Sequence, residues 1–319
     1  MNYLVTGGCG FIGSHVLRQL KRQGHNPVCY DLHPHKTSID QVLTPEEIEE
    51  LTIIEGGLED QKALEQVMRD NQIDVVIHLA GILGDVAERD PEAAVKTNIL
   101  GTIHIFEAAL AVGIKRVVWA SSQSIFGTEE FYRDLYHTDL VPNDVVLKPT
   151  LVYGATKTFN EFLGEWYYKN RGLETIGLRY TMVFGIARMR GAGQYATNLI
   201  NKPAVGEKGV VEYGETAPNW IYVEDAARAT VIAAQCPNPK TRNFTIGGEV
   251  KPIPEVKEYI MTLLPDAQIE LLPGAFPSCY NLDCSAAEEE LGYRYEYTVE
   301  EGAHLTINLL REKAGLPPV

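Results

Sequence analysis

The sequence predicts an α/β protein with a doubly wound parallel sheet and a smaller C-terminal α/β lobe. Two observations predict this fold class. Strand-length apolar segments alternate with helix-length segments through the first two thirds of the chain, a pattern that places crossover helices on both faces of a parallel sheet. The run that begins at Asp74 is almost wholly apolar after its first residue, as expected for a strand buried on both faces.

The elements follow in a regular order along this first part. We expect strands near residues 2–6, 27–31, 52–55, 74–79, 115–121 and 174–179. We expect helices near residues 11–23, 60–71, 91–112 and 153–171. The alternation of the two lists is the doubly wound pattern.

The pattern changes after Gly185. Residues 186–215 are poorly periodic, residues 220–236 have a helical pattern, and residues 243–246 suit one more strand. From Lys251, short helices alternate with turns that contain proline. We therefore predict a large domain of residues 1–185 and 216–250, and a smaller lobe of residues 186–215 and 251–319. The cleft between them is the expected substrate site.

Composition and charge narrow the class of protein. The chain has 319 residues, of which 45% are hydrophobic and 22% are charged, as in a globular protein with a sizeable core. Its net charge of 28 − 43 = −15 argues against a nucleic-acid partner and an anionic membrane surface. The five cysteines form no C-x-x-C pair, so we expect reduced thiols in the cytoplasm. We expect no apolar run long enough to span a bilayer.

A glycine-rich turn follows the N-terminal strand. The run Tyr3-Leu-Val-Thr-Gly-Gly-Cys-Gly-Phe-Ile-Gly13 places Gly7, Gly10 and Gly13 three residues apart. Such a turn lets the backbone approach a pyrophosphate, while the N-terminus of the next helix directs its N–H groups at the negative charge. The turn therefore predicts a bound dinucleotide.

Asp31 ends the second expected strand, where a carboxylate accepts hydrogen bonds from the ribose hydroxyls of a dinucleotide. The same carboxylate repels the 2′-phosphate of NADP. We therefore expect NAD as the cofactor, although the nearby His33, His35 and Lys36 would weaken that repulsion.

Tyr153 and Lys157 are spaced so that they share one face of a helix. An ammonium group near a phenol stabilises the phenolate and lowers the tyrosine pKa, which allows proton exchange near neutral pH. Ser121 and Ser122 come at the carboxyl end of the strand near 115–121, the edge where active groups of open parallel sheets gather. A hydroxyl there can orient the substrate oxygen that gains or loses a proton.

These motifs are similar to those of an extended short-chain dehydrogenase/reductase of the NAD-dependent epimerase/dehydratase family. The matching segments, in family order, are 6–13, 78–81, 90–98, 121–127, 153–157, 178–180, 220–225, 243–248, 290–293 and 300–302. The resemblance implies a Rossmann-type domain and NAD-dependent chemistry on a small molecule.

The resemblance also implies roles for single residues. Tyr153 matches the catalytic acid/base, Lys157 the residue that binds the nicotinamide ribose and tunes the tyrosine, and Ser122 the catalytic hydroxyl. Besides Tyr153 and Lys157, the implied NAD-binding residues are Gly7, Gly10, Phe11, Ile12, Gly13, Asp31, Leu58, Asp60, Leu79, Ala80 and Asn98. Gly57 stands where the family usually has an acid before Leu58, so that contact with adenine is lacking.

Other departures concern the substrate. Thr181 and Pro218 stand where family members that act on nucleotide sugars have Asn and Arg, and no Lys or Arg occurs between Lys257 and Arg294. We infer a substrate without a nucleotide diphosphate, because a buried diphosphate needs cationic partners. The cations that could rebuild such a site are Arg188, Arg190, Lys202 and Lys208. Gln123 and Ser124 replace the Asp-Glu pair of sugar dehydratases, which argues against 4,6-dehydration.

Three functions remain open on the sequence. We favour an enzyme that oxidises a secondary alcohol, or reduces a ketone, of a sugar-like or other small polar substrate with NAD. An epimerase would use the same proton and hydride steps and then return the hydride to the other face. A protein that senses NAD without turnover is disfavoured by the complete set of Ser122, Tyr153 and Lys157. No metal site is expected, because the histidines lack partners at ligand spacing.

The resemblance implies a homodimer. Helices 91–112 and 153–171 would pair across a two-fold axis into a four-helix interface, and their alanine and aromatic residues suit close helix packing.

Overall fold

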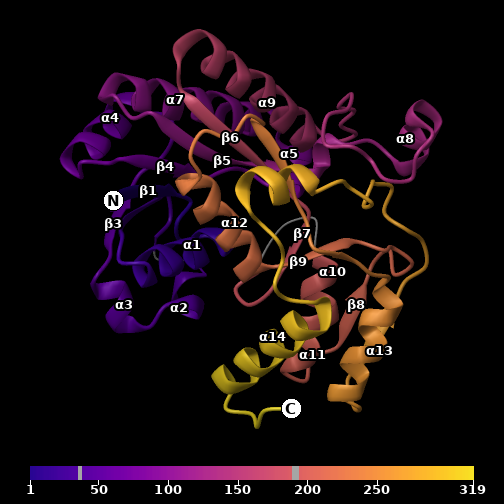
Figure 1. Ribbon diagram of the computed structural model, residues 1–319. Helices are drawn as coiled ribbons and strands as arrows, with labels where there is room; N and C mark the ends of the chain where they lie inside the picture. The colour runs from indigo at the N-terminus through magenta and orange to yellow at the C-terminus, as the bar shows by residue number, and fades with distance from the viewer. Residues whose placement is uncertain (35–37, 189–193) are drawn as a thin grey trace.

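The computed structural model describes residues 1–34, 38–188 and 194–319 (Figure 1). The main sheet has seven parallel strands in the order β10-β6-β5-β4-β1-β2-β3. These are β1 (Asn2–Thr6), β2 (Asn26–Asp31), β3 (Thr52–Glu55), β4 (Val75–His78), β5 (Arg116–Ser122), β6 (Glu174–Tyr180) and β10 (Asn243–Ile246). Each boundary lies within one residue of its prediction, which confirms the parallel α/β class.

Helices cover both faces of the main sheet (Figure 1). One face carries α1 (Phe11–Arg22) and α12 (Val223–Gln235), which pack against each other. The other carries α4 (Gln61–Asp70), α7 (Gly101–Val112) and α9 (Val152–Arg171). The α9 helix ends at Gly172, whose φ of 68° is a left-handed conformation that glycine adopts without strain.

One helical segment differs from expectation. Pro91–Val112, which comprises α6 (Pro91–Ala94), a π-helical turn at Val95–Leu100 and α7, is long and apolar enough to cross a membrane by length and composition, with a mean hydropathy of 1.2. The expectation that the chain has no such run is therefore wrong. In the fold, Ile105, Phe106 and Ala109 of this segment are buried, and α7 packs on α4. Core packing thus explains part of its apolar character.

A second, three-stranded sheet has the order β11-β9-β7, with β7 at Met182–Phe184, β9 at Asn219–Tyr222 and β11 at Glu249–Val250. The prediction of helix from residue 220 is therefore wrong at its start. Trp220, Ile221 and Tyr222 are fully buried large side chains that suit a strand, and α12 begins only at Val223, with two acidic residues in its first turn.

The remaining elements are short or belong to the C-terminal part. β8 (Gly209–Val211) pairs with β12 (Ile269–Leu271). The helices are α2 (Ile39–Val42), α3 (Pro45–Glu49), α5 (Gly84–Arg89), α8 (Glu129–Tyr136), α10 (Gln194–Ala196), α11 (Lys202–Ala204), α13 (Ile253–Leu263) and α14 (Val299–Lys313).

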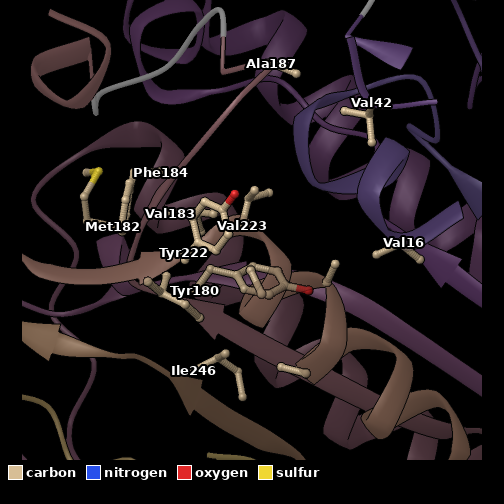
Figure 2. Packing of buried hydrophobic residues seen from close by; sticks show 14 of the residues in the cluster. Val16, Val42, Tyr180, Met182, Val183, Phe184, Ala187, Tyr222, Val223 and Ile246 are labelled. Atoms are coloured by element: carbon tan, nitrogen blue, oxygen red, sulfur yellow. The ribbon is translucent and has the colours of Figure 1, made fainter. Parts of the chain in front are cut away.

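The largest apolar core lies on the α1/α12 face of the main sheet. Figure 2 shows part of it, with Tyr180 and Ile246 from the main sheet beside Phe184 and Tyr222 from the second sheet. The same cluster continues to Leu199 and other buried residues of the C-terminal part. The segments after Gly185 are therefore packed onto the sheet by apolar burial rather than tethered by linkers.

Candidate active site

The predicted site residues gather at the carboxyl edge of the main sheet. Strands β1, β4 and β5 are neighbours there, and Thr6 pairs in register with His78. Beyond these strand ends come the glycine-rich turn, the Leu79–Ala80 segment and Ser122. In an open parallel sheet this edge is where ligands bind.

The glycine-rich turn packs directly against the segment after β4. Gly7 has a φ of 67°, and a Cβ atom at this position would lie 2.7 Å from the backbone nitrogen of Ala80. A Cβ atom at Gly13 would lie 2.1 Å from the carbonyl oxygen of Gly7. Both positions require glycine: a side chain at Gly7 would push the turn away from Leu79 and Ala80, and one at Gly13 would push the start of α1 away from Gly7 and Gly8.

The start of α1 offers free donors for a phosphate. Its N-cap residue is Gly10, and no side chain caps the helix. The first N–H groups of α1, which include those of Phe11 and Ile12, therefore have no intrahelical or capping partner. An uncapped helix N-terminus beside a glycine cradle fits a dinucleotide pyrophosphate.

Asp31 lies beside this cradle at the end of β2. Its carboxylate accepts hydrogen bonds from the backbone N–H of Cys9 at 3.1 Å and of His33 at 3.0 Å. A carboxylate has four lone-pair sites, so acceptor capacity remains for ribose hydroxyls. His35 and Lys36, which we expected to weaken the repulsion of a 2′-phosphate, lie outside the described residues.

Three further predicted residues have structural contacts of their own. The Asp60 carboxylate caps α4 by accepting from the N–H of Ala63 at 3.1 Å. The carbonyl of the buried Leu58 is 2.6 Å from the His104 ring. Asn98 accepts from the N–H of Ile82 at 2.7 Å and donates to its carbonyl at 3.0 Å, which fixes the chain beyond Ala80.

Ser122, Tyr153 and Lys157 are brought together by the contact of β5 with α9. The Lys157 Nζ donates to the carbonyl of Ala120 at 2.7 Å and lies 5.7 Å from the centre of the Tyr153 ring. The hydroxyl of Ser122 accepts from the N–H of Ser124 at 3.1 Å. The predicted set is thus assembled at one place.

The loop that follows Ser122, here called the serine loop, approaches α9 closely only because residue 154 is glycine. We did not single out Gly154 in the sequence. A Cβ atom there would lie 2.0 Å from the carbonyl oxygen of Ser124. The spacing of Tyr153 and Lys157 carries no signal for this contact, because it arises only when the two elements pack.

Burial dominates the electrostatics of this set. It lowers the pKa of Lys157 to about 8 and raises the pKa of Tyr153 above its ordinary value. Hydrogen bonding to Ser122 and the positive charge of Arg188 oppose the rise at Tyr153. The positive charge of Arg188 is thus one of the groups that lower the tyrosine pKa, while the Lys157 amine, which we expected to act in this way, donates to Ala120 and lies 5.7 Å from the centre of the Tyr153 ring.

A partly enclosed pocket adjoins the serine loop. It is lined by neutral residues from both sides of Gly185 in the sequence. These residues are Gln123, Ser124, Phe126, Thr150, Leu151, Met182, Tyr195, Phe276, Pro277, Ser278 and Tyr280. Among the residues that the structure describes, this lining has hydroxyl and amide groups but no Lys or Arg. Of the loop cations considered from the sequence, Lys208 pairs with Glu270 at 2.7 Å, and Arg190 lies outside the described residues. No metal-ligating cluster occurs within the described ranges.

Comparison with known proteins decides the family. A model of the NAD dependent epimerase/dehydratase family matches residues 3–247. The chain belongs to this family. It is therefore an NAD-dependent enzyme of the extended short-chain dehydrogenase/reductase type, the class that its motifs predict.

Relatives of this family member include epimerases and dehydrogenases. The chain is 28% identical to a UDP-glucuronate 4-epimerase of Thermodesulfobacterium geofontis, over 98% of this chain and 97% of that protein. It is 25% identical to the UDP-glucose 4-epimerase of Thermotoga maritima solved with UDP-glucose, with a TM-score of 0.85 over 98% of this chain and 100% of that one. L-Threonine 3-dehydrogenase from Trypanosoma brucei shares the fold, with 20% identity, a TM-score of 0.85 and 99% of each chain covered.

Proposed function

We propose that this enzyme oxidises a secondary alcohol of a sugar-like or other small polar substrate with NAD, or reduces the corresponding ketone. The observation that carries the proposal is the assembly of Ser122, Tyr153 and Lys157 beside the glycine cradle. One edge of the sheet thus carries both a proton-exchanging phenol and a dinucleotide site.

The three side chains have distinct tasks in this proposal. Tyr153 takes the proton of the substrate hydroxyl, and Ser122 hydrogen-bonds the same oxygen and orients it. Lys157 holds the nicotinamide ribose and completes the Tyr-Lys-Ser proton relay. The hydrogen bond from the Lys157 Nζ to the Ala120 carbonyl holds the amine on the side of α9 that faces the sheet. The side chain therefore needs no change of rotamer to bind the ligand.

The cradle residues Gly7, Gly10 and Gly13 with Phe11 and Ile12 would hold the pyrophosphate, and Asp31 the adenosine ribose. The adenine would lie by Leu58 and Asp60, and the remaining cofactor channel by Leu79, Ala80 and Asn98. When bound, NAD supplies the acceptor for the hydride that leaves the carbinol carbon. The side chains of this chain select and orient the alcohol and move its proton.

The substrate is proposed to lie between the large domain (1–185 and 216–250) and the smaller lobe (186–215 and 251–319). No Lys or Arg is among the described lining residues, which supports a substrate without a nucleotide diphosphate, since the two negative charges of a buried diphosphate require several cationic partners. Hydroxyl groups of Tyr195, Ser278 and Tyr280 suit a polyhydroxy compound.

A sugar epimerase is the second candidate, because UDP-sugar epimerases are among the relatives. It shares the proton and hydride steps, so residue chemistry does not separate the two functions. The amount of free NADH separates the two functions. A dehydrogenase releases NADH in proportion to substrate consumed, whereas an epimerase gives a new diastereomer and no net change in the coenzyme.

The test is a panel of sugars, uronates, hydroxy acids and UDP-sugars, followed by absorbance of reduced nicotinamide and by product analysis. NADH formation with one neutral or acidic small molecule supports the main proposal. Diastereomer formation from a UDP-sugar without free NADH would replace it with the epimerase.

We also infer a cytoplasmic homodimer with no nucleic-acid or membrane partner. Phe159, Phe162 and Trp166 on α9 are 43%, 69% and 43% exposed, and Val95 and Leu100 are similarly exposed on the preceding long helix. Such aromatic exposure supports an interface through these two helices. No disulfide joins any of the five cysteines, all of which lie in the described ranges, and this suits a reducing compartment.

A further inference from the structure

Arg188 lies close to the start of α1, beside the glycine-rich turn. Its guanidinium is 5.5 Å from the centre of the Phe11 ring, at the start of α1. Its charge acts on the phenols of Tyr153, the proposed base, and Tyr195, which lines the pocket. One cation thus lies beside the start of α1, and its electric field reaches the phenols of Tyr153 and Tyr195.

The chain holds this residue firmly on several sides. The preceding Ala187 is buried and has a φ of 73°, a left-handed conformation that costs a non-glycine residue free energy. The Ala187 carbonyl accepts a hydrogen bond from the Ser38 hydroxyl at 2.7 Å. The Arg188 carbonyl accepts from the Thr197 hydroxyl at 3.3 Å, and the Arg188 Nη1 donates to the carbonyl of Val183. A strained, anchored backbone of this kind is typical of functional positions.

The positive charge of Arg188 has no negative partner. Within residues 1–34, 38–188 and 194–319, no carboxylate pairs with it, and its buried Nε has no hydrogen-bond partner. The residues at 35–37 and 189–193 include no Asp or Glu. Burial lowers the pKa of Arg188 to about 10, which still leaves the group protonated near neutral pH.

A partly buried cation without a counter-ion is costly and is normally compensated by an anion. Because Nη1 already donates to the Val183 carbonyl, the Nε and Nη2 groups are the paired N–H donors that match a carboxylate. The pyrophosphate has its own donors at the uncapped start of α1, and the Phe11 ring lies against the guanidinium on that side. The phenols of Tyr153 and Tyr195 mark the substrate side.

We propose that Arg188 binds a carboxylate group of the substrate, close to the carbinol that Tyr153 deprotonates. The inference rests on the proposed function and narrows its substrate class to hydroxy acids and sugar acids. Arg188 fixes the acid end, Ser122 and Tyr153 engage the hydroxyl, and the neutral lining accepts the remainder of the molecule.

The test uses matched acid and neutral compounds on NAD-saturated protein. The pairs are D-glucuronate with D-glucose, D-galacturonate with D-galactose, L-threonine with L-threoninol, and 3-hydroxybutyrate with 1,3-butanediol. Calorimetric binding is measured on the Tyr153→Phe background so that turnover does not interfere. We expect at least one acid to bind about tenfold or more tightly than its neutral partner, as for a charge-assisted hydrogen-bonded pair.

Arg188→Met should remove this preference and leave NAD affinity within about threefold, whereas Arg188→Lys should keep part of it because the charge remains without the planar fork. Lys208→Met is the control, since it removes a cation that pairs with Glu270 at an exposed site. Thermal unfolding of each variant establishes that the protein is folded.

Two outcomes overturn the proposal. In one, no acid in the panel binds more tightly than its neutral partner. In the other, Arg188→Met weakens NAD about tenfold or more and leaves acid binding unchanged, which would make a cofactor phosphate the anion. Failure of the proposed function would look different, because turnover by the Tyr153→Phe enzyme would contradict that function whatever the acid preference.

Discussion

At Gly154, one added methyl group would push the serine loop away from α9, the helix that carries Tyr153. A Cβ atom there would lie 2.0 Å from the Ser124 carbonyl oxygen and 3.0 Å from the Cβ of Pro149. Real Cβ contacts stay beyond 3.0 Å, so Gly154→Ala must move the two elements apart by about 3.0 − 2.0 = 1.0 Å. The obstacle on the loop side is backbone, which cannot turn away as a flexible side chain can.

The expected magnitude combines two opposed effects on stability. Overpacking costs about 1–3 kcal/mol, and alanine in place of glycine within a helix recovers about 1 kcal/mol. We expect a net loss of about 1 kcal/mol in the free energy of unfolding. The effect on turnover is larger, because displacement of a positioned catalytic group by about 1 Å costs about 100-fold in rate.

Gly164→Ala is the matched control in the same helix. A Cβ atom there has its nearest contact at 3.3 Å, with the side-chain oxygen of Thr175. This variant should gain stability from helix propensity or stay neutral, and it should keep its activity. Denaturant unfolding and steady-state turnover of the substrate found by the panel measure both variants. If Gly154→Ala behaves like Gly164→Ala in both assays, the inferred contact between loop and helix is wrong.

Three further predictions concern cofactor choice, pH and assembly. Asp31→Ser should lower kcat/KM with NAD about tenfold, because the charge-assisted hydrogen bonds to the ribose are lost. It should raise kcat/KM with NADP about tenfold, because the repulsion of the 2′-phosphate is lost too. An unchanged coenzyme preference would show that Asp31 does not bind the ribose. Lys157→Met should abolish turnover yet unfold at a higher temperature than wild type below pH 8, since burial lowers the pKa of Lys157 from 10.5 to about 8 and so disfavours its charged form. Between pH 8 and pH 10.5 the folded state binds fewer protons than the unfolded state, so the free energy of unfolding of the wild type rises with pH. The difference in melting temperature between Lys157→Met and wild type should therefore shrink over this range. A difference in melting temperature that does not change with pH would contradict this prediction. Phe162→Glu should convert the proposed dimer to monomers in sedimentation equilibrium, because it places a charge in the proposed interface. A monomeric wild type would contradict the interface altogether.

The sequence predicted the elements whose pattern is local. Parallel strands such as β4 are continuous apolar runs, and the glycine spacing before α1 is informative because a strand precedes it and a helix follows. Tyr153 and Lys157 were found because their spacing fixes a shared helix face.

The rest depends on packing between distant segments. The strands β7, β9 and β11 have three, four and two residues, too few for a periodicity to show, and their pairing joins residues far apart in the chain. Gly154 became visible only as a contact with Ser124. The sequence named Arg188 as one of four candidate cations, and only the structure showed that it lacks a carboxylate partner among the described residues. A sequence lists cations and glycines but does not show which of them lack a partner or lie against another backbone.

The central claim is that Tyr153 moves the proton of the substrate alcohol in an NAD-dependent oxidation. Turnover by Tyr153→Phe, measured with NAD affinity on the same protein, tests it most directly. We predict that kcat falls about 100- to 10,000-fold, the range supplied by a positioned acid or base, while NAD binds as in wild type. Unchanged kcat in a folded, NAD-binding variant would contradict the account.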